Sequence, residues 1–234
     1  MDQMYEFAKG PFFKFSFAVL ILGLLRLITL NAIGILGAVR KTNDKKIPYK
    51  KLIKETLMWL FPIKIITNSR AVFSIISFLF HIGLIIVPLF FLDHILLWRQ
   101  GLNISWPHIP GIAADILSLL TIFAGLYLLG NRTFDRNTRF ISKAIDYLLL
   151  VLILSIFITG LIASKPVNPI PYKVTMFIHI MCGNVLFILI PFTKLAHCLL
   201  FPIIRIASNI AWRFPAEAGE KINKTLYNKE IRKI

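Results

Sequence analysis

Charged residues are scarce in this 234-residue sequence, and acidic ones are scarcer still. Asp, Glu, Lys and Arg make up 16% of the chain, with only 11 acids against 27 Lys or Arg, whereas soluble domains carry about 25% charged residues. Hydrophobic residues make up 57% of the chain. This balance excludes an ordinary soluble domain and indicates a polytopic membrane protein. The excess of cations falls in short segments between apolar runs, so we expect a lipid bilayer, and not nucleic acid, as the partner.

Cysteine is also scarce, and internal repeats are absent. The two cysteines, Cys182 and Cys198, form neither a CxxC nor a CxxCH motif. This excludes a disulfide framework, an iron–sulfur cluster or covalently attached haem c within the chain, and we expect both cysteines to be small packing residues. A transporter of this size would more often show repeated halves and broken, glycine-rich helices. A non-redox transporter or assembly anchor nevertheless stays the competing class.

Five apolar runs are long enough to cross a bilayer as helices. We expect spans at residues 12–39, 71–98, 112–129, 144–163 and 173–205, followed by a basic tail at 206–234. The expected fold is a single domain, 1–234, of the all-α membrane class, with five transmembrane helices. Between the first two spans, Tyr49–Ile66 mixes lysines with Leu, Trp and Phe. This pattern predicts an amphipathic helix lying on the membrane surface and ended by Pro62.

The distribution of Lys and Arg orients the spans. The segment 40–70, the loop 132–143 and the tail from Arg205 hold nine, four and seven of them, whereas the N-terminus and the other two loops hold two, one and two. With five crossings these groups alternate in side. The positive-inside rule therefore places the N-terminus outside and the C-terminus in the cytoplasm.

The last span carries a histidine toward either end. His179 and His197 are 18 residues apart, which is five whole helical turns, so both rings should leave one face roughly 27 Å apart along a straight axis. Pro191 lies between them and can kink the helix, so this shared face is approximate.

The second span carries its own pair, His81 and His94. They are 13 residues apart, which places them about 140° off a common face in a straight helix. Pro88 lies between them and can change the phase of the helix.

Orientation then pairs the four histidines by depth: His81 with His197 near the inner surface, and His94 with His179 near the outer one. Two helices that each carry a histidine toward either end can hold two haems across a membrane by bis-histidine ligation. The alternative is that the histidines bond neighbouring helices or serve a proton path. We expect four axial ligands to haem iron and a bundle built around two haems.

Other polar residues in or near the spans have two open interpretations. Arg26 interrupts the first span and is a candidate partner for an acidic haem propionate, with snorkelling to the surface equally open. Asp93 and Asp115 are candidates for proton transfer or quinone binding, although solvated helix ends are the more ordinary explanation. His108 lies in a loop beside prolines and is expected to be an interfacial surface residue.

Several of these segments resemble the respiratory nitrate reductase gamma subunit family. The matching segments are Phe80-His81-Ile82-Gly83, Phe187-Ile188-Leu189-Ile190-Pro191-Phe192 and Leu195-Ala196-His197. In nitrate reductase proper the second histidine of this span lies ten residues after the first, where this chain has Phe91. The sequence is more similar to the cytochrome b subunits of sulfate-reducer complexes of the Dsr, Hmc and Tmc type. The residues that carry this similarity are His94, Leu97-Trp98 and Ser105-Trp106-Pro107.

The resemblance implies a membrane subunit with two haems b in a larger electron-transfer complex. Its implied partners are menaquinone, a cytoplasmic iron–sulfur subunit similar to heterodisulfide reductase, a periplasmic multihaem cytochrome c and further membrane subunits. The cytoplasmic partner is expected to bind at 40–70 and at the basic tail. A nitrate reductase gamma subunit that oxidises quinol is the alternative within the family.

Overall fold

The computed structural model describes residues 1–42, 49–60, 71–166, 170–211 and 224–225. The described residues fold into helices and contain no strand. Among these described residues, five helical segments are long and apolar enough to cross a membrane: Asp2–Gly37, Ala71–Phe90, Gly111–Phe134, Ala144–Ala163 and Tyr172–Phe192. The chain divides into two compact units, Met1–Phe17 with Pro62–Phe187 and Ala18–Phe61 with Ile188–Ile234.

The two N-terminal helices meet at a Gly-Pro pair. α1 (Asp2–Lys9) ends at Gly10, and α2 (Pro11–Thr42) begins with Pro11 at its first position, where the missing N–H costs the helix nothing. α2 contains the predicted span 12–39 and continues through Arg26 without a break. Its 32 residues extend about 48 Å, longer than the roughly 30 Å core of a bilayer.

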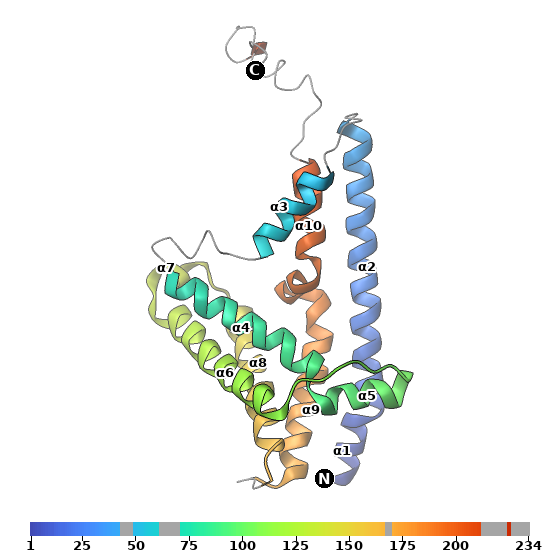
Figure 1. Ribbon diagram of the computed structural model, residues 1–234, viewed down its shortest axis with the longest axis vertical. Helices are drawn as coiled ribbons and strands as arrows, with labels where there is room; N and C mark the ends of the chain where they lie inside the picture. The colour runs from blue at the N-terminus through green and yellow to red at the C-terminus, as the bar shows by residue number, and fades with distance from the viewer. Residues whose placement is uncertain (43–48, 61–70, 167–169, 212–223, 226–234) are drawn as a thin grey trace. The chain divides into compact units, whose positions relative to one another are not determined.

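The second apolar run is not one helix. α4 (Ala71–Phe90) is followed by α5 (Leu92–Leu102), with Phe91 between them in an extended conformation. The predicted span 71–98 is therefore too long, because the helix ends eight residues earlier. Figure 1 shows α5 leaving the direction of α4. Pro88 lies inside the last turn of α4, where a missing N–H weakens helical bonding.

The core of the first unit is formed by three packed helices. α6 (Gly111–Phe134) lies against α4 on one side and against α8 (Ala144–Ala163) on the other, as both views show. Glycines permit the close contacts. A Cβ at Gly125 would lie 2.7 Å from Leu154 Cδ2 and 3.1 Å from Phe80 Cε2. Small residues at helix crossings are typical of membrane helix pairs. α6 and α8 contain the predicted spans 112–129 and 144–163.

Gly83 gives a stability prediction at the contact between α4 and α6. A Cβ at this position would overlap Thr121 Oγ1 and lie 3.1 Å from the Leu117 carbonyl oxygen. Replacing glycine by alanine within a helix ordinarily adds about 1 kcal/mol of stability. Here we expect Gly83→Ala to lower the free energy of unfolding by about 1–3 kcal/mol, because the helices must separate.

Thermal unfolding in detergent measures this effect. Gly183→Ala is the matched control, because a Cβ at Gly183 meets nothing within 4 Å. Adding Thr121→Ala to Gly83→Ala should recover part of the loss by removing the overlapping hydroxyl. An unfolding temperature of Gly83→Ala equal to that of Gly183→Ala would contradict the close packing.

The last apolar run is broken too. α9 (Tyr172–Leu189) is followed by two 3-10 turns, η1 (Ile190–Phe192) and η2 (Lys194–Ala196), and then by α10 (His197–Ala211). Thr193 is extended, and its hydroxyl accepts a hydrogen bond from Leu195 N at 3.3 Å. The last apolar run is therefore not one continuous helix over 173–205. His179 and His197 belong to different units, so their shared face stays a prediction. Pro191 begins the interruption because proline cannot donate a helical hydrogen bond.

The second unit contains the predicted amphipathic helix. α3 (Tyr49–Leu60) packs against α10 and buries Thr56. Ile53, Leu57 and Met58 are exposed beside Lys50 and Lys54, as in a helix with both apolar and basic faces. Residues 61–66 of the prediction, and nearly all of the tail 206–234 beyond α10, lie outside the described residues.

Candidate haem site

The break between α4 and α5 releases three backbone carbonyls from helical bonding, and each has a donor nearby. His94 Nδ1 lies 3.1 Å from the Pro88 oxygen, Trp106 Nε1 donates to the Leu89 oxygen at 2.7 Å, and Ile109 N donates to the Phe90 oxygen at 3.0 Å. Satisfying these carbonyls stabilises the break, because an unpaired carbonyl in an apolar environment is costly. The break therefore fixes the position and the orientation of the His94 ring.

His179 on α9 is held by α8 in a similar way. Its Nδ1 lies 3.0 Å from the Ile156 carbonyl oxygen and 3.3 Å from Thr159 Oγ1. Gly160 leaves space for the ring, since a Cβ there would lie 2.9 Å from His179 Cε1 and 3.3 Å from Nδ1. A larger residue at position 160 would push the imidazole away from α8.

His94 and His179 come together within the first unit. Their ring centroids are 6.2 Å apart, and the ring planes are parallel to within 10°. An imidazole nitrogen lies about 1.1 Å from its ring centroid and binds a metal at about 2.0 Å, so two imidazoles on opposite sides of one metal ion have centroids about 6.2 Å apart. The spacing of this pair is compatible with His94 and His179 together holding one haem iron.

The hydrogen bonds also select the tautomer that a metal ligand needs. A backbone carbonyl can only accept, so Nδ1 carries the proton in both His94 and His179. Nε2 is then the unprotonated nitrogen, and it has no hydrogen-bond partner among the described residues. Metal-binding histidines typically donate the other ring N–H to a carbonyl in this way.

One buried polar atom near His179 has no partner. Thr175 lies one helical turn before His179 on α9, is 1% exposed, and its Oγ1 has no hydrogen-bond partner in the described part of the chain. A buried hydroxyl normally finds an acceptor. A haem propionate is one group that would supply this acceptor, so Thr175 also fits a haem at this position.

The inner histidines belong to different units, so their pairing stays a prediction. His81 on α4 is half-buried, with Nδ1 2.6 Å from the Ser77 oxygen and its ring edge-on to Phe80. His197 at the start of α10 is exposed. Its Nδ1 contacts the Lys194 oxygen, and its Nε2 lies 3.7 Å from Cys198 Sγ. In all four histidines Nδ1 therefore faces a backbone carbonyl.

The described residues contain no group of three or more His, Cys, Asp or Glu side chains that could hold a metal ion. Bis-histidine ligation needs only two protein ligands, because the porphyrin supplies the other four. The His94–His179 pair is thus compatible with a haem and does not form a zinc-type site, which would need three or four protein ligands.

The remaining candidate residues make no hydrogen bond or ion pair with His94 or His179 within the described part of the chain. Arg26 is exposed on α2, in the second unit. Asp115 is paired with Lys165, and Asp93 is exposed in the first turn of α5. His108 is exposed in the segment that joins α5 to α6. Cys182 is half-buried, Cys198 is exposed, and both are free thiols.

A buried polar network near His179 could not be found from sequence. Asn184 is 1% exposed, accepts a hydrogen bond from Ser16 Oγ at 3.0 Å and donates to the Ala8 oxygen at 2.9 Å. It therefore joins α9 to both N-terminal helices. An Asn within an apolar run was the only sequence signal. Gly160 and Trp106 gave no signal, because their roles depend on contacts far along the chain.

Comparison with known proteins finds a relative in Nitratidesulfovibrio vulgaris strain Hildenborough. The two sequences are 30% identical over 202 residues, covering 85% of this chain and 88% of the relative. The chain belongs to the same family as that protein. No protein-family model and no solved structure matches the chain. Its likeness to nitrate reductase gamma subunits stays a prediction from the motifs above.

Proposed function

We propose that this protein is a haem b subunit of a respiratory electron-transfer complex in a prokaryotic cytoplasmic membrane. The observation that carries the proposal is the His94–His179 pair, with ring centroids 6.2 Å apart and both Nδ1 atoms against backbone carbonyls. Five helical segments long and apolar enough to span a bilayer support the membrane setting. The family resemblance of the motifs around His81, His179 and His197 supports the redox function.

The chain's own residues would position two cofactors. His94 and His179 would hold an outer haem b, and His81 with His197 would hold an inner one. Haem supplies reversible one-electron chemistry whose potential depends on its ligands and on burial. The carbonyls of Pro88 and Ile156 orient the outer imidazoles, and the apolar helices keep water and ions away. Arg26 remains a candidate partner for a propionate of the inner haem.

The proposed partners follow from the resemblance and from charge. Electrons would move between menaquinone or a periplasmic multihaem cytochrome c and a cytoplasmic iron–sulfur subunit on the inner side. The twenty Lys or Arg residues in segments expected on the inner side favour an acidic partner and anionic lipid there. The N-terminus would lie outside and the C-terminus in the cytoplasm.

Reaction with quinol tests this function. The protein is extracted in mild detergent from its native membrane, and its absorption is followed while a menaquinol analogue is added. We expect reduction of b-type absorption bands and co-purification of a cytoplasmic iron–sulfur protein. The same preparation pretreated with a quinone-site inhibitor is the control and should react several-fold more slowly. Haems that respond to dithionite but not to menaquinol, in a protein isolated alone, would refute the proposed role.

A further inference from the structure

The connection between α6 and α8 carries exposed side chains to which the proposed electron transfer assigns no specific role. It runs through residues 132–143 and contains the short helix α7 (Arg136–Ile141). Because α6 and α8 are consecutive candidate spans, this connection lies where both reach the same membrane surface. We call residues 132–143 the α7 turn.

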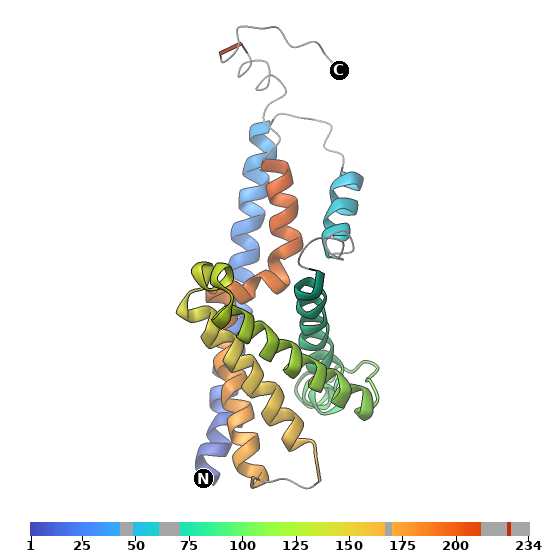
Figure 2. The same ribbon diagram turned by 90° about the vertical axis from the view of Figure 1, so that its left-hand side faces the viewer.

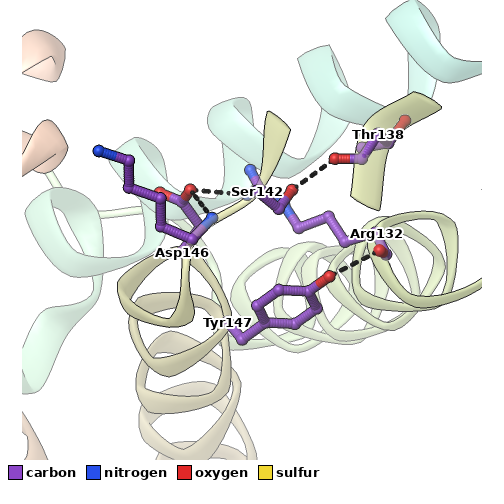
Figure 3. Close-up of polar contacts among 6 residues, drawn as sticks. Arg132, Thr138, Ser142, Asp146 and Tyr147 are labelled. Atoms are coloured by element: carbon purple, nitrogen blue, oxygen red, sulfur yellow. Dashed lines mark hydrogen bonds and ion pairs between the residues drawn. The ribbon is translucent and has the colours of Figure 1, made fainter. Parts of the chain in front are cut away.

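The α7 turn is held in one conformation by its own hydrogen bonds, several of which Figure 3 shows. Asp135 caps α7 by accepting from Thr138 N at 2.9 Å, and Ser142 Oγ donates to the Thr138 oxygen at 2.7 Å. Asp146, 7% exposed, accepts from Lys143 N at 2.9 Å and lies 3.9 Å from Arg132 NH1. Tyr147 OH donates to the Arg132 oxygen at 2.7 Å. The turn therefore needs little ordering before it binds a ligand.

Large apolar side chains project from this ordered turn. Phe140, Phe134 and Ile141 are 90%, 86% and 73% exposed, and they are three of the four most exposed large hydrophobic residues in the described part of the chain. Their backbone is fixed by the bonds above, so their exposure is not that of a loose terminus. Side chains of this kind at the end of a membrane helix insert at the boundary between headgroups and acyl chains.

The α7 turn also carries two arginines whose side chains can bind an anion. Arg136 and Arg139 are exposed and have no ion-pair or hydrogen-bond partner among the described residues. In the described part of the chain, the nearby acids form no ion pair with them: Asp135 caps α7, and Asp146 at the start of α8 lies near Arg132. A guanidinium binds phosphate oxygens well, since its N–H groups match their geometry.

We propose that the α7 turn is a binding site for anionic phospholipid, with Arg136 and Arg139 on the headgroup phosphate and Phe134, Phe140 and Ile141 in the acyl boundary. The combination of exposed aromatic side chains, arginines without an ion-pair partner among the described residues and a position between two spans fits a lipid at the membrane surface. The inference rests on the membrane setting proposed above and not on haem binding.

Lipid binding to the purified full-length protein tests the site. The protein in neutral detergent is titrated with phosphatidylglycerol or phosphatidylcholine, and bound lipids are counted by native mass spectrometry. We expect the wild type to retain phosphatidylglycerol in preference to phosphatidylcholine. Arg136→Gln with Arg139→Gln should lose at least one retained phosphatidylglycerol, with affinity at this site falling roughly 30-fold.

Three further variants separate charge, apolar contact and folding. Lys9→Gln with Arg99→Gln removes the same charge from other exposed positions and should bind like the wild type. Arg136→Lys with Arg139→Lys should keep most of the binding, and Phe140→Ser with Ile141→Ser should weaken binding of both lipids. Haem content is measured in each preparation, so a failure of haem binding is distinguished from a failure of lipid binding.

The proposal would be overturned if Arg136→Gln with Arg139→Gln retained as much phosphatidylglycerol as the wild type. It would also be overturned if the wild type bound the two lipids equally, or if a cytoplasmic protein displaced lipid from the α7 turn in the native membrane.

Discussion

Replacing His94 or His179 by alanine is expected to leave the protein with one haem in place of two. Each variant removes one axial ligand of the outer site, and the remaining imidazole cannot hold the iron from both sides. The inner haem should be retained, because His81 and His197 are unchanged. Haem per protein, measured on the purified variants from the absorbance of the pyridine adduct, should fall from about two to about one.

His108→Ala is the matched control, because it removes an exposed histidine from the connection that follows α5. It should keep both haems. His81→Ala or His197→Ala should lose the inner haem and keep the outer one, which gives the complementary spectrum. Two haems retained in His94→Ala would mean that the outer site has a different ligand, and the pairing argued from the 6.2 Å ring separation would be wrong.

Gly160→Val is expected to empty the outer site although it replaces no ligand. The Cβ would lie 2.9 Å from His179 Cε1, and the two methyl groups beyond it would force the ring away from its hydrogen bond to Ile156. A displacement of about 1 Å is enough to spoil positions that must hold within about 0.5 Å. Haem content should fall toward one per chain, while Gly160→Ala should retain more haem with a shifted outer potential.

Gly183→Val and Gly183→Ala are the controls, since a Cβ at Gly183 has open space around it. Both should bind two haems. A general loss of folding would remove the inner haem as well, so the inner haem reports whether Gly160→Val acts locally. Normal haem content and an unchanged outer potential in Gly160→Val would contradict the position of His179 against α8.

The long helices could be predicted from sequence because their apolar runs match the length of a bilayer. The helix breaks could not be located. Pro88 and Pro191 indicated kinks, but a proline in a helix can be tolerated when other groups bond the released carbonyls. Next to Phe91, the donors that bond the released carbonyls and so stabilise the break are Trp106 and Ile109, which lie on a later segment. Such distant contacts have no local sequence signature.

The candidate site could be predicted from the sequence only in part. Matching depths on oppositely directed spans predicted that His94 and His179 would be neighbours, and the structure brings the two rings together. The reasoning from a straight last helix was wrong, since α9 ends before His197. Gly160, Thr175 and Asn184 were missed because their roles come from packing against other helices. Haem ligation by all four histidines stays a prediction.

The visible spectrum of the purified protein tests the central claim most directly. The protein is produced in a host that makes ample haem b, purified folded in mild detergent, and measured in oxidised and dithionite-reduced forms together with its protein concentration. The proposal predicts reduced b-type bands and about two non-covalently bound haems per chain. A folded protein without haem absorption would contradict it and would favour a non-redox membrane protein.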